Sequence, residues 1–225
     1  MTIPEQPDDW TEPGAHQVRP GVHRIPLPLP NSELHAVNTY LVASPDGPVL
    51  VDPGWASQES EKALTAALKS LGCRITDISR IVVTHTHWDH YSQAMRLRAV
   101  YGIPVLLGRG SRASLEAFSA DEGLYPRQIE LLRRCGAFDL ADRIAATEPT
   151  EYERDMPHGL PDTWLDHGEW LGLGERKLDV LATPGHTAGH ITYWFHANKI
   201  AFAGDPLFSI GCGRVIEGTM GQMWN

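Results

Sequence analysis

Cysteine is scarce in this sequence. Only three occur in 225 residues, at Cys73, Cys135 and Cys212, and no two of them form a CxxC pair. An odd and scattered set indicates neither a disulfide framework nor a zinc site built from cysteines. We therefore expect a reducing compartment.

Long apolar runs and excess positive charge are also missing. No stretch reaches the roughly 18 apolar residues of a membrane-spanning helix, and the acidic, proline-rich start does not resemble a signal peptide. The net charge of -9 argues against a surface that binds phosphate backbones. These absences predict a cytoplasmic protein that binds neither membranes nor nucleic acid.

The length and composition fit one globular domain. Apolar residues make up 42% and charged residues 21% of the chain, which is enough to build a core. Residues 1–20 hold four prolines and few apolar groups, so we expect a flexible N-terminal arm there and a folded domain over residues 21–225.

Apolar periodicity predicts alternating strands and helices. Residues 111–155 read as a helical insertion that overhangs the site, and the rest predicts a layered α/β domain. The strands are expected at Val22–Leu29, Asn38–Ala43, Pro48–Val51, Ile81–Val83, Lys177–Ala182, His190–Phe195 and Lys199–Ala203, and the helices at Ser57–Leu71 and Tyr91–Tyr101.

The clearest chemical signal is the heptapeptide THTHWDH at residues 84–90. His85 and His87 lie two apart on an extended segment, so they point to one side and can share a metal ion. Asp89 and His90 follow at the start of a helix, where the chain can direct a carboxylate and an imidazole into the same cavity. The alternative is a loop of surface histidines, which is a rare origin for this spacing.

Two later segments follow the same design. His186 lies in PGHTAGH and Asp205 in FAGD, each in a loop just after an apolar strand. Ligand residues are common in such loops, although a single histidine or aspartate there more often caps a turn. Together with the histidine cluster they favour a metal site, whereas His190, which begins a strand, is expected to be structural.

The order HTHWDH, PGHTAGH and AGD resembles the metallo-β-lactamase superfamily over about residues 20–225. The resemblance implies an αββα sandwich with two Zn²⁺ ions, or with iron or manganese in their place. It implies that the first metal is bound by His85, His87 and His186, the second by Asp89 and His90, and both by a bridging Asp205.

Asp52, in the sequence VDPG, matches an early motif of that superfamily. Two roles are open for it. It either orients a ligand imidazole from behind or caps the turn in which it lies.

The stretch from Gly204 to Met223 resembles hydroxyacylglutathione hydrolase, also called glyoxalase II. In that family a basic residue at the position of Arg214 contacts the glutathione carboxylate, so Arg214 is a candidate for substrate binding. Two positions depart from the family, Pro206 where threonine is usual and Ile216 where an aromatic is usual.

The family also has one more metal-binding histidine on a later strand, and no histidine follows His196 here. We therefore expect the second metal to bind more weakly, because it lacks a ligand. The last strand and the C-terminal helices of the fold are expected to be missing as well. The surface they would cover makes pairing of two copies of the chain a candidate arrangement.

The resemblance implies a metal-dependent hydrolase of a small thioester or ester, with an acyl-glutathione as the leading substrate. Metal ions lower the pKa of bound water from about 15.7 towards about 7, so hydroxide is the expected nucleophile. Asp89 and Asp205 are the candidate catalytic residues. Two alternatives stay open: a mononuclear iron persulfide dioxygenase, and an incomplete, inactive or binding-only member of the superfamily.

Overall fold

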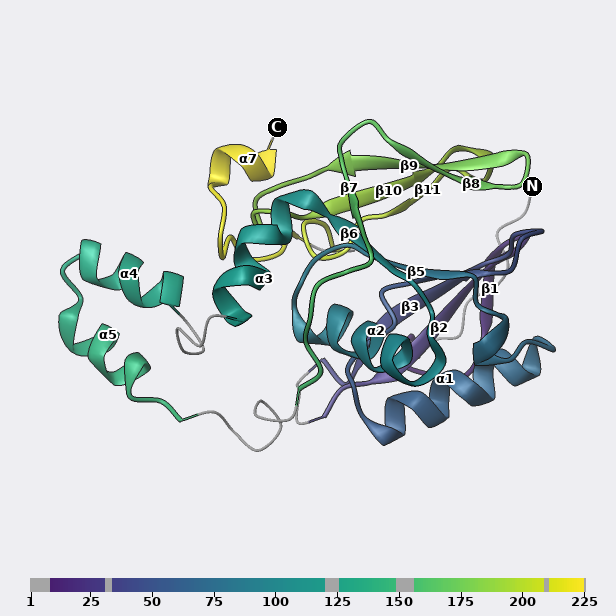
Figure 1. Ribbon diagram of the computed structural model, residues 1–225, viewed down its shortest axis with the longest axis horizontal. Helices are drawn as coiled ribbons and strands as arrows, with labels where there is room; N and C mark the ends of the chain where they lie inside the picture. The colour runs from purple at the N-terminus through teal and green to yellow at the C-terminus, as the bar shows by residue number, and fades with distance from the viewer. Residues whose placement is uncertain (1–8, 31–33, 120–125, 149–155, 209–210, 225) are drawn as a thin grey trace.

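The computed structural model describes residues 9–30, 34–119, 126–148, 156–208 and 211–224. They form two β-sheets packed face to face, with helices α1 and α2 on the outer face of the larger sheet (Figure 1). The larger sheet has seven strands in the order β1-β2-β3-β4-β5-β6-β7, and the smaller has four in the order β11-β10-β9-β8. No helix of these residues is long and apolar enough to cross a membrane.

The seven-stranded sheet changes from antiparallel to parallel at β4. Its strands are β1 (His16–Arg19), β2 (Val22–Pro28), β3 (Ala36–Val42), β4 (Val49–Val51), β5 (Arg80–Val83), β6 (Val105–Gly108) and β7 (Thr163–Leu165). Strands β4 to β7 pair in parallel. Because parallel strands end at the same edge, the loops that follow β4, β5 and β6 open side by side.

The four-stranded sheet is antiparallel throughout. It consists of β8 (Trp170–Leu173), β9 (Arg176–Ala182), β10 (Ile191–Phe195) and β11 (Ile200–Phe202). Side chains alternate along these strands, so Leu178, Tyr193 and Phe195 are fully buried and pack against Val82 and Leu106 of the other sheet. This contact forms the core between the sheets.

A second core lies between the seven-stranded sheet and two helices, α1 (Gln58–Ser70) and α2 (Trp88–Tyr101). Helix α1 begins where the Ser57 side chain accepts a hydrogen bond from the backbone N–H of Ser60. Its buried Leu64 and Leu68 face the sheet. Helix α2 ends at Gly102, whose φ of 71° is the left-handed conformation usual after a helix.

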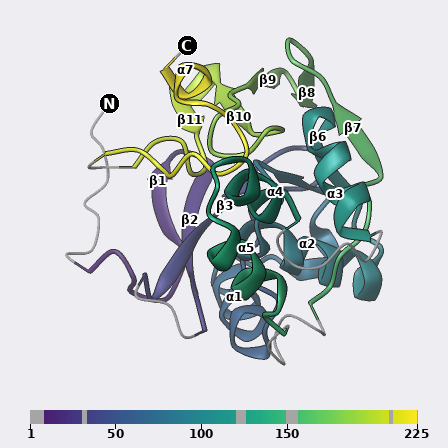
Figure 2. The same cartoon turned by 90° about the vertical axis from the view of Figure 1, so that its left-hand side faces the viewer.

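The remaining helices are short. Helices α3 (Arg112–Ser119), α4 (Pro126–Arg134) and α5 (Phe138–Ala145) occupy the predicted insertion, and α7 (Met220–Trp224) lies near the C-terminus. Single turns of 3₁₀ helix occur at Ile75–Asp77, Arg109–Ser111 and His196–Asn198. Helices α4 and α5 form a hairpin that projects from the body on the side of α3 (Figures 1 and 2).

The layered α/β fold expected from the sequence is confirmed, and several details differ. The predicted flexible arm is too long, because His16–Arg19 form β1 and pair with β2. Helix α2 begins at Trp88 and so includes Asp89 and His90. Strands β6, β7 and β8 were not predicted. Within the predicted insertion, residues 120–125 and 149–155 lie outside the described part of the chain.

Candidate metal centre

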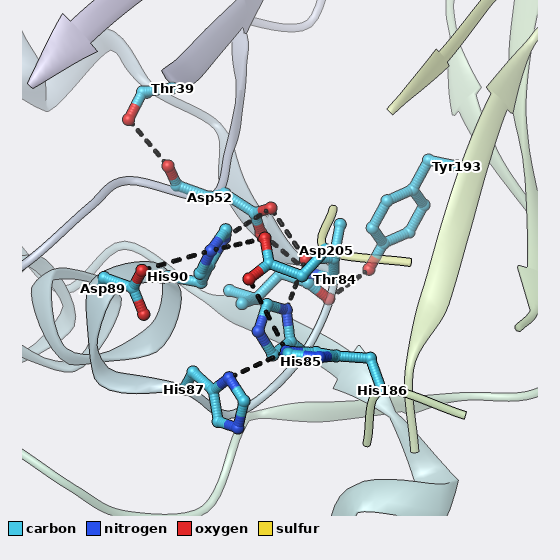
Figure 3. Close-up of polar contacts among 11 residues, drawn as sticks. Thr39, Asp52, Thr84, His85, His87, Asp89, His90, His186, Tyr193 and Asp205 are labelled. Carbon is cyan, nitrogen blue, oxygen red and sulfur yellow. Dashed lines mark hydrogen bonds and ion pairs between the residues drawn. The ribbon is translucent and has the colours of Figure 1, made fainter. Parts of the chain in front are cut away.

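Three histidines and one aspartate from the two sheets converge at one end of the sandwich (Figure 3). His85 and His87 follow β5, His186 follows β9 and Asp205 follows β11. One donor atom from each residue lies within 4.8 Å of all the others. Among the described residues this is the one such group of metal-ligand type.

Hydrogen bonds between the sheets bring these loops together. The backbone N–H of Ile191 donates to the carbonyl of Thr84 at 2.8 Å, and the Tyr193 hydroxyl donates to the carbonyl of Val83 at 2.9 Å. Both bonds join β10 to the end of β5. The loop that carries His85 is therefore fixed against the smaller sheet, which supplies His186 and Asp205.

The imidazole of His186 is held in one orientation. Its Nδ1 lies 2.7 Å from the carbonyl oxygen of Arg214, and because a carbonyl only accepts, Nδ1 donates and Nε2 carries the lone pair. Nε2 lies 3.0 Å from Nδ1 of His87 and 3.5 Å from Oδ2 of Asp205. Two nitrogens on a tetrahedral zinc ion are about 3.3 Å apart, so these spacings fit a shared ion.

His85 supplies the strongest sign that the donor set suits a cation. Its side chain is fully buried, Nδ1 lies 3.0 Å from the Thr84 hydroxyl, and Nε2 has no hydrogen-bond partner among the described residues. A buried nitrogen without a partner is costly unless something binds it. Burial also keeps the pKa of His85 well below its usual value, so the ring is neutral, as metal binding requires.

His87 and Asp205 are also in the form that binds a metal. Burial and the neighbouring His186 lower the pKa of His87 to about 4. Burial alone would raise the pKa of Asp205, but hydrogen bonding and charge from His90 and His186 outweigh it and lower the pKa to about 2. At neutral pH His85 and His87 therefore offer neutral imidazoles and Asp205 offers a carboxylate.

His90 and Asp89 lie beside this cluster. Nε2 of His90 is 3.2 Å from Oδ1 of Asp205 and 3.6 Å from Oδ2 of Asp89. Burial opposes a positive charge on His90, yet the carboxylates of Asp89 and Asp52 raise its pKa well above the usual value. The carboxylates around His90 therefore attract positive charge. Asp205 directs one oxygen to His186 and the other to His90, as a bridging ligand would.

Asp52 lies behind the ligands in a strained backbone conformation, with φ of 48°. Its carboxylate accepts hydrogen bonds from the backbone N–H and the hydroxyl of Thr84, both at 2.7 Å, and from Nδ1 of His90 at 3.0 Å. The geometry favours the orienting role over a turn cap. Through Thr84, which also touches His85, the carboxylate acts on two imidazoles.

Three other residues near the site differ in how well the sequence anticipated them. Thr84 lies inside the histidine motif, but the sequence does not indicate that its hydroxyl links Asp52 to His85. Arg214 is exposed, and its side chain has no hydrogen bond or ion pair within the described part of the chain. His190, expected to be structural, is buried, stacks on His85 with 5.0 Å between ring centroids, and has its pKa lowered to about 3 by burial.

Comparison with protein families places residues 33–224 in a family described as the metallo-beta-lactamase superfamily. A hydroxyacylglutathione hydrolase of Rhodospirillum rubrum is 31% identical over 176 residues, which cover 78% of this chain and 49% of that protein. One from Methylobacterium nodulans is 33% identical over 162 residues, which cover 72% of this chain and 46% of the relative. The chain thus spans about half the length of these curated relatives.

Solved structures agree on the fold. A metallo-beta-lactamase family protein from Thermus thermophilus superposes with a TM-score of 0.74 at 26% identity, covering 92% of this chain and 67% of that one. A subclass B3 metallo-beta-lactamase of Bradyrhizobium japonicum gives 0.64 at 19% identity, covering 96% of this chain and 73% of that one. The second likeness bears on the fold alone.

Proposed function

Because this chain belongs to the metallo-beta-lactamase superfamily, a family of hydrolases that typically bind divalent metals, we propose that it hydrolyses a small thioester, with an acyl-glutathione as the first candidate. The observation that carries the proposal is the four-donor cluster of His85, His87, His186 and Asp205. The relatives named hydroxyacylglutathione hydrolase support the choice of a thioester over other bonds.

The donor set supports a separate role for each residue. His85, His87, His186 and Asp205 would hold the first ion, and Asp89, His90 and Asp205 a second. Nitrogen-rich sites of this kind suit zinc, and iron also accepts such ligands. Ions bound there would lower the pKa of a water molecule and polarise the substrate carbonyl.

Around the ions, the protein's own groups would position the reactants. Asp205 is ionised and Asp89 is partly exposed, so both carboxylates can accept a hydrogen bond from the attacking water. The guanidinium of Arg214 is exposed and lies on the segment whose backbone contacts His186, so it can bind a carboxylate of the substrate with paired donors.

The experiment is an assay of zinc-loaded protein with S-lactoylglutathione, a thioester without glutathione, and a simple ester. We expect the wild-type protein to hydrolyse S-lactoylglutathione fastest and His186→Ala to hydrolyse none of the three substrates. His196→Ala is the matched control, because His196 is exposed, pairs with Asp179 of β9 and lies outside the donor cluster. Turnover of esters alone would exclude the glutathione substrate, and inactivity of the loaded protein on all three would reject the proposal.

One observation favours a second candidate, an oxygenase that uses a single iron and a glutathione persulfide. The described residues contain one four-donor group, and Asp89 and His90 lie outside it. Metal analysis separates the two functions. One iron per chain together with oxygen consumption on glutathione persulfide supports the oxygenase, whereas zinc with thioester turnover and no oxygen consumption excludes it.

A further inference from the structure

The segment Gly213–Gly218 lies directly against the loop that carries His186. Arg214 offers its carbonyl to Nδ1 of His186 at 2.7 Å. The backbone N–H groups of Ile216 and Glu217 both donate to the carbonyl of His186, at 3.0 and 3.2 Å. The ligand is therefore contacted at its ring and at its backbone by the same six-residue segment.

Glu217 adds a side-chain contact that crosses this loop. Its Oε2 accepts hydrogen bonds from the backbone N–H of Ala188 at 2.9 Å and from the hydroxyl of Ser114 at 3.1 Å. Ser114 belongs to α3, so one carboxylate joins the C-terminal segment, the His186 loop and the first helix of the insertion. Hydrogen bonds to an ionised acceptor are stronger than those between neutral groups.

The His186 loop is also packed closely against Ser111. The Ser111 hydroxyl donates to the carbonyl of Gly189 at 3.2 Å, and a Cβ on Gly189 would lie only 2.0 Å from the backbone nitrogen of Ser111. These contacts hold the loop at Gly189, and the segment anchored by Glu217 holds it at His186 and Ala188.

We propose that Glu217 is a positioning residue for His186. Its carboxylate keeps the His186 loop and the Gly213–Gly218 segment in register, so that the Arg214 carbonyl meets Nδ1 and directs Nε2 towards His87 and Asp205. Groups that orient a ligand imidazole from behind set its basicity and its angle to the ion. The inference rests on the proposed metal site and is independent of the substrate.

The test measures metal binding instead of turnover. The zinc dissociation constant comes from competition with a chelator, and the visible spectrum of the cobalt-loaded protein reports the ligand geometry. We expect Glu217→Ala to bind zinc about 10- to 100-fold more weakly and to change the cobalt spectrum. Glu217→Gln keeps an oxygen that accepts from Ala188, so it should stay within about threefold of the wild type.

Glu169→Ala is the matched control. The Glu169 carboxylate also accepts from a backbone N–H, that of Asp166 at 3.0 Å, but in an exposed turn before β8. We expect it to leave affinity and spectrum unchanged. Wild-type affinity and spectrum in Glu217→Ala would overturn the proposal, as would an equal loss in Glu169→Ala.

If Glu217→Ala does not fold, Glu217→Asp decides the question. It keeps the charge but is one methylene too short to reach Ala188 and Ser114 together. Weaker zinc binding than in Glu217→Gln supports the proposal, and wild-type binding refutes it. None of these readouts involves a substrate, so a failed thioester assay would not affect the conclusion about Glu217. Wild-type protein without any zinc affinity would reject the metal site itself.

Discussion

At the scale of single residues, the site depends on which nitrogen of each imidazole carries a proton. His186 donates from Nδ1 to a carbonyl and His90 from Nδ1 to the Asp52 carboxylate, so both present Nε2 to Asp205. His85 presents a buried Nε2 without a partner among the described residues. The surrounding acceptors, and not the histidines alone, make the cluster suitable for a cation.

This dependence predicts the effect of Asp52→Asn. The amide can place its NH₂ group against Nδ1 of His90, which moves the ring proton to Nε2, where it faces Asp205. We expect binding of the second metal ion to weaken by about 10- to 100-fold. Chelator competition measures it, with the exposed Asp46→Asn as control. Unchanged binding of both ions would show that Asp52 does not set the tautomer.

The identity of the four clustered residues could be predicted from the sequence, because His85 and His87 have a diagnostic spacing and His186 and Asp205 follow strands. Their partners could not. The contact of Arg214 with His186 is made by its backbone carbonyl, which no side-chain pattern in the sequence can indicate. The sequence instead predicted a role for the exposed guanidinium of Arg214. Likewise, Glu217 contacts Ala188 only because the fold brings residues 29 positions apart together.

At the scale of elements, loops around the site approach so closely that certain positions admit only glycine. A Cβ on Gly213 would lie 1.9 Å from the carbonyl oxygen of Asp205 and 3.3 Å from Nδ1 of His186. Gly221 offers a contrast, since its nearest neighbour would be the Thr219 hydroxyl at 3.9 Å. The segment therefore depends on a missing side chain to reach the ligands.

We predict that Gly213→Ala lowers the free energy of unfolding by about 1–3 kcal/mol, because the added methyl group must displace backbone. It should also weaken zinc binding, since Asp205 and His186 are the displaced neighbours. Urea unfolding and chelator competition measure the two effects. Gly221→Ala should lower neither, because alanine is favourable in helix α7 and meets no close neighbour there. An equal loss in the two variants would contradict the argument.

A second element-scale prediction concerns pH. Asp162 forms a two-pronged ion pair with Arg98 of α2 at 2.8 Å and accepts from the backbone N–H of Val105 at 2.9 Å, which joins α2 to β6. These bonds, that to Arg98 above all, lower the pKa of Asp162 below 3.8. Its stabilisation is thus present above 3.8 and is lost as pH falls through the lower folded-state pKa.

Asp162→Asn should therefore lower the free energy of unfolding by about 1 kcal/mol at pH 7. At a pH below 3.8 the difference should be smaller, because the wild-type carboxylate protonates as pH falls through its lowered pKa. Urea unfolding at both pH values measures it. A difference that stays constant or grows on acidification would mean that the pair does not contribute in this way.

The sequence predicted elements with a clear apolar pattern and missed four strands. Helix α1 and strands β2, β3 and β9 were located within a few residues because each has its own apolar pattern. Strands β4, β5, β6, β7, β8 and β11 have only three or four residues each, too few for a period to be seen, and β6, β7 and β8 were missed. Strand β1 was missed because its HQVR sequence pairs at the edge of the sheet and is largely polar.

At the scale of the whole molecule, the donor cluster joins the two sheets. His85 and His87 come from the seven-stranded sheet, and His186 and Asp205 from the four-stranded one. Between the sheets lies a core that includes Leu178 and Phe195. An ion bound at the cluster would therefore add a second link to the one that apolar packing provides.

Metal removal should accordingly lower the Tm of the protein. A ligand that binds only the folded state adds about 2.7 kcal/mol at a free concentration roughly 100 times its Kd. We expect zinc to raise Tm in a concentration-dependent way and a chelator to reverse it, while His186→Ala shows little response. Calorimetry with and without zinc measures this, and an equal zinc response in His186→Ala would place the stabilising ion elsewhere.

The unequal exposure of the four donors sets an order of events for metal exchange. The His85 side chain is completely buried, whereas that of Asp205 is 23% exposed. An ion entering the cluster would therefore meet the partly exposed carboxylate of Asp205 before the buried imidazole of His85. Release would follow the reverse order, with the carboxylate as the last contact.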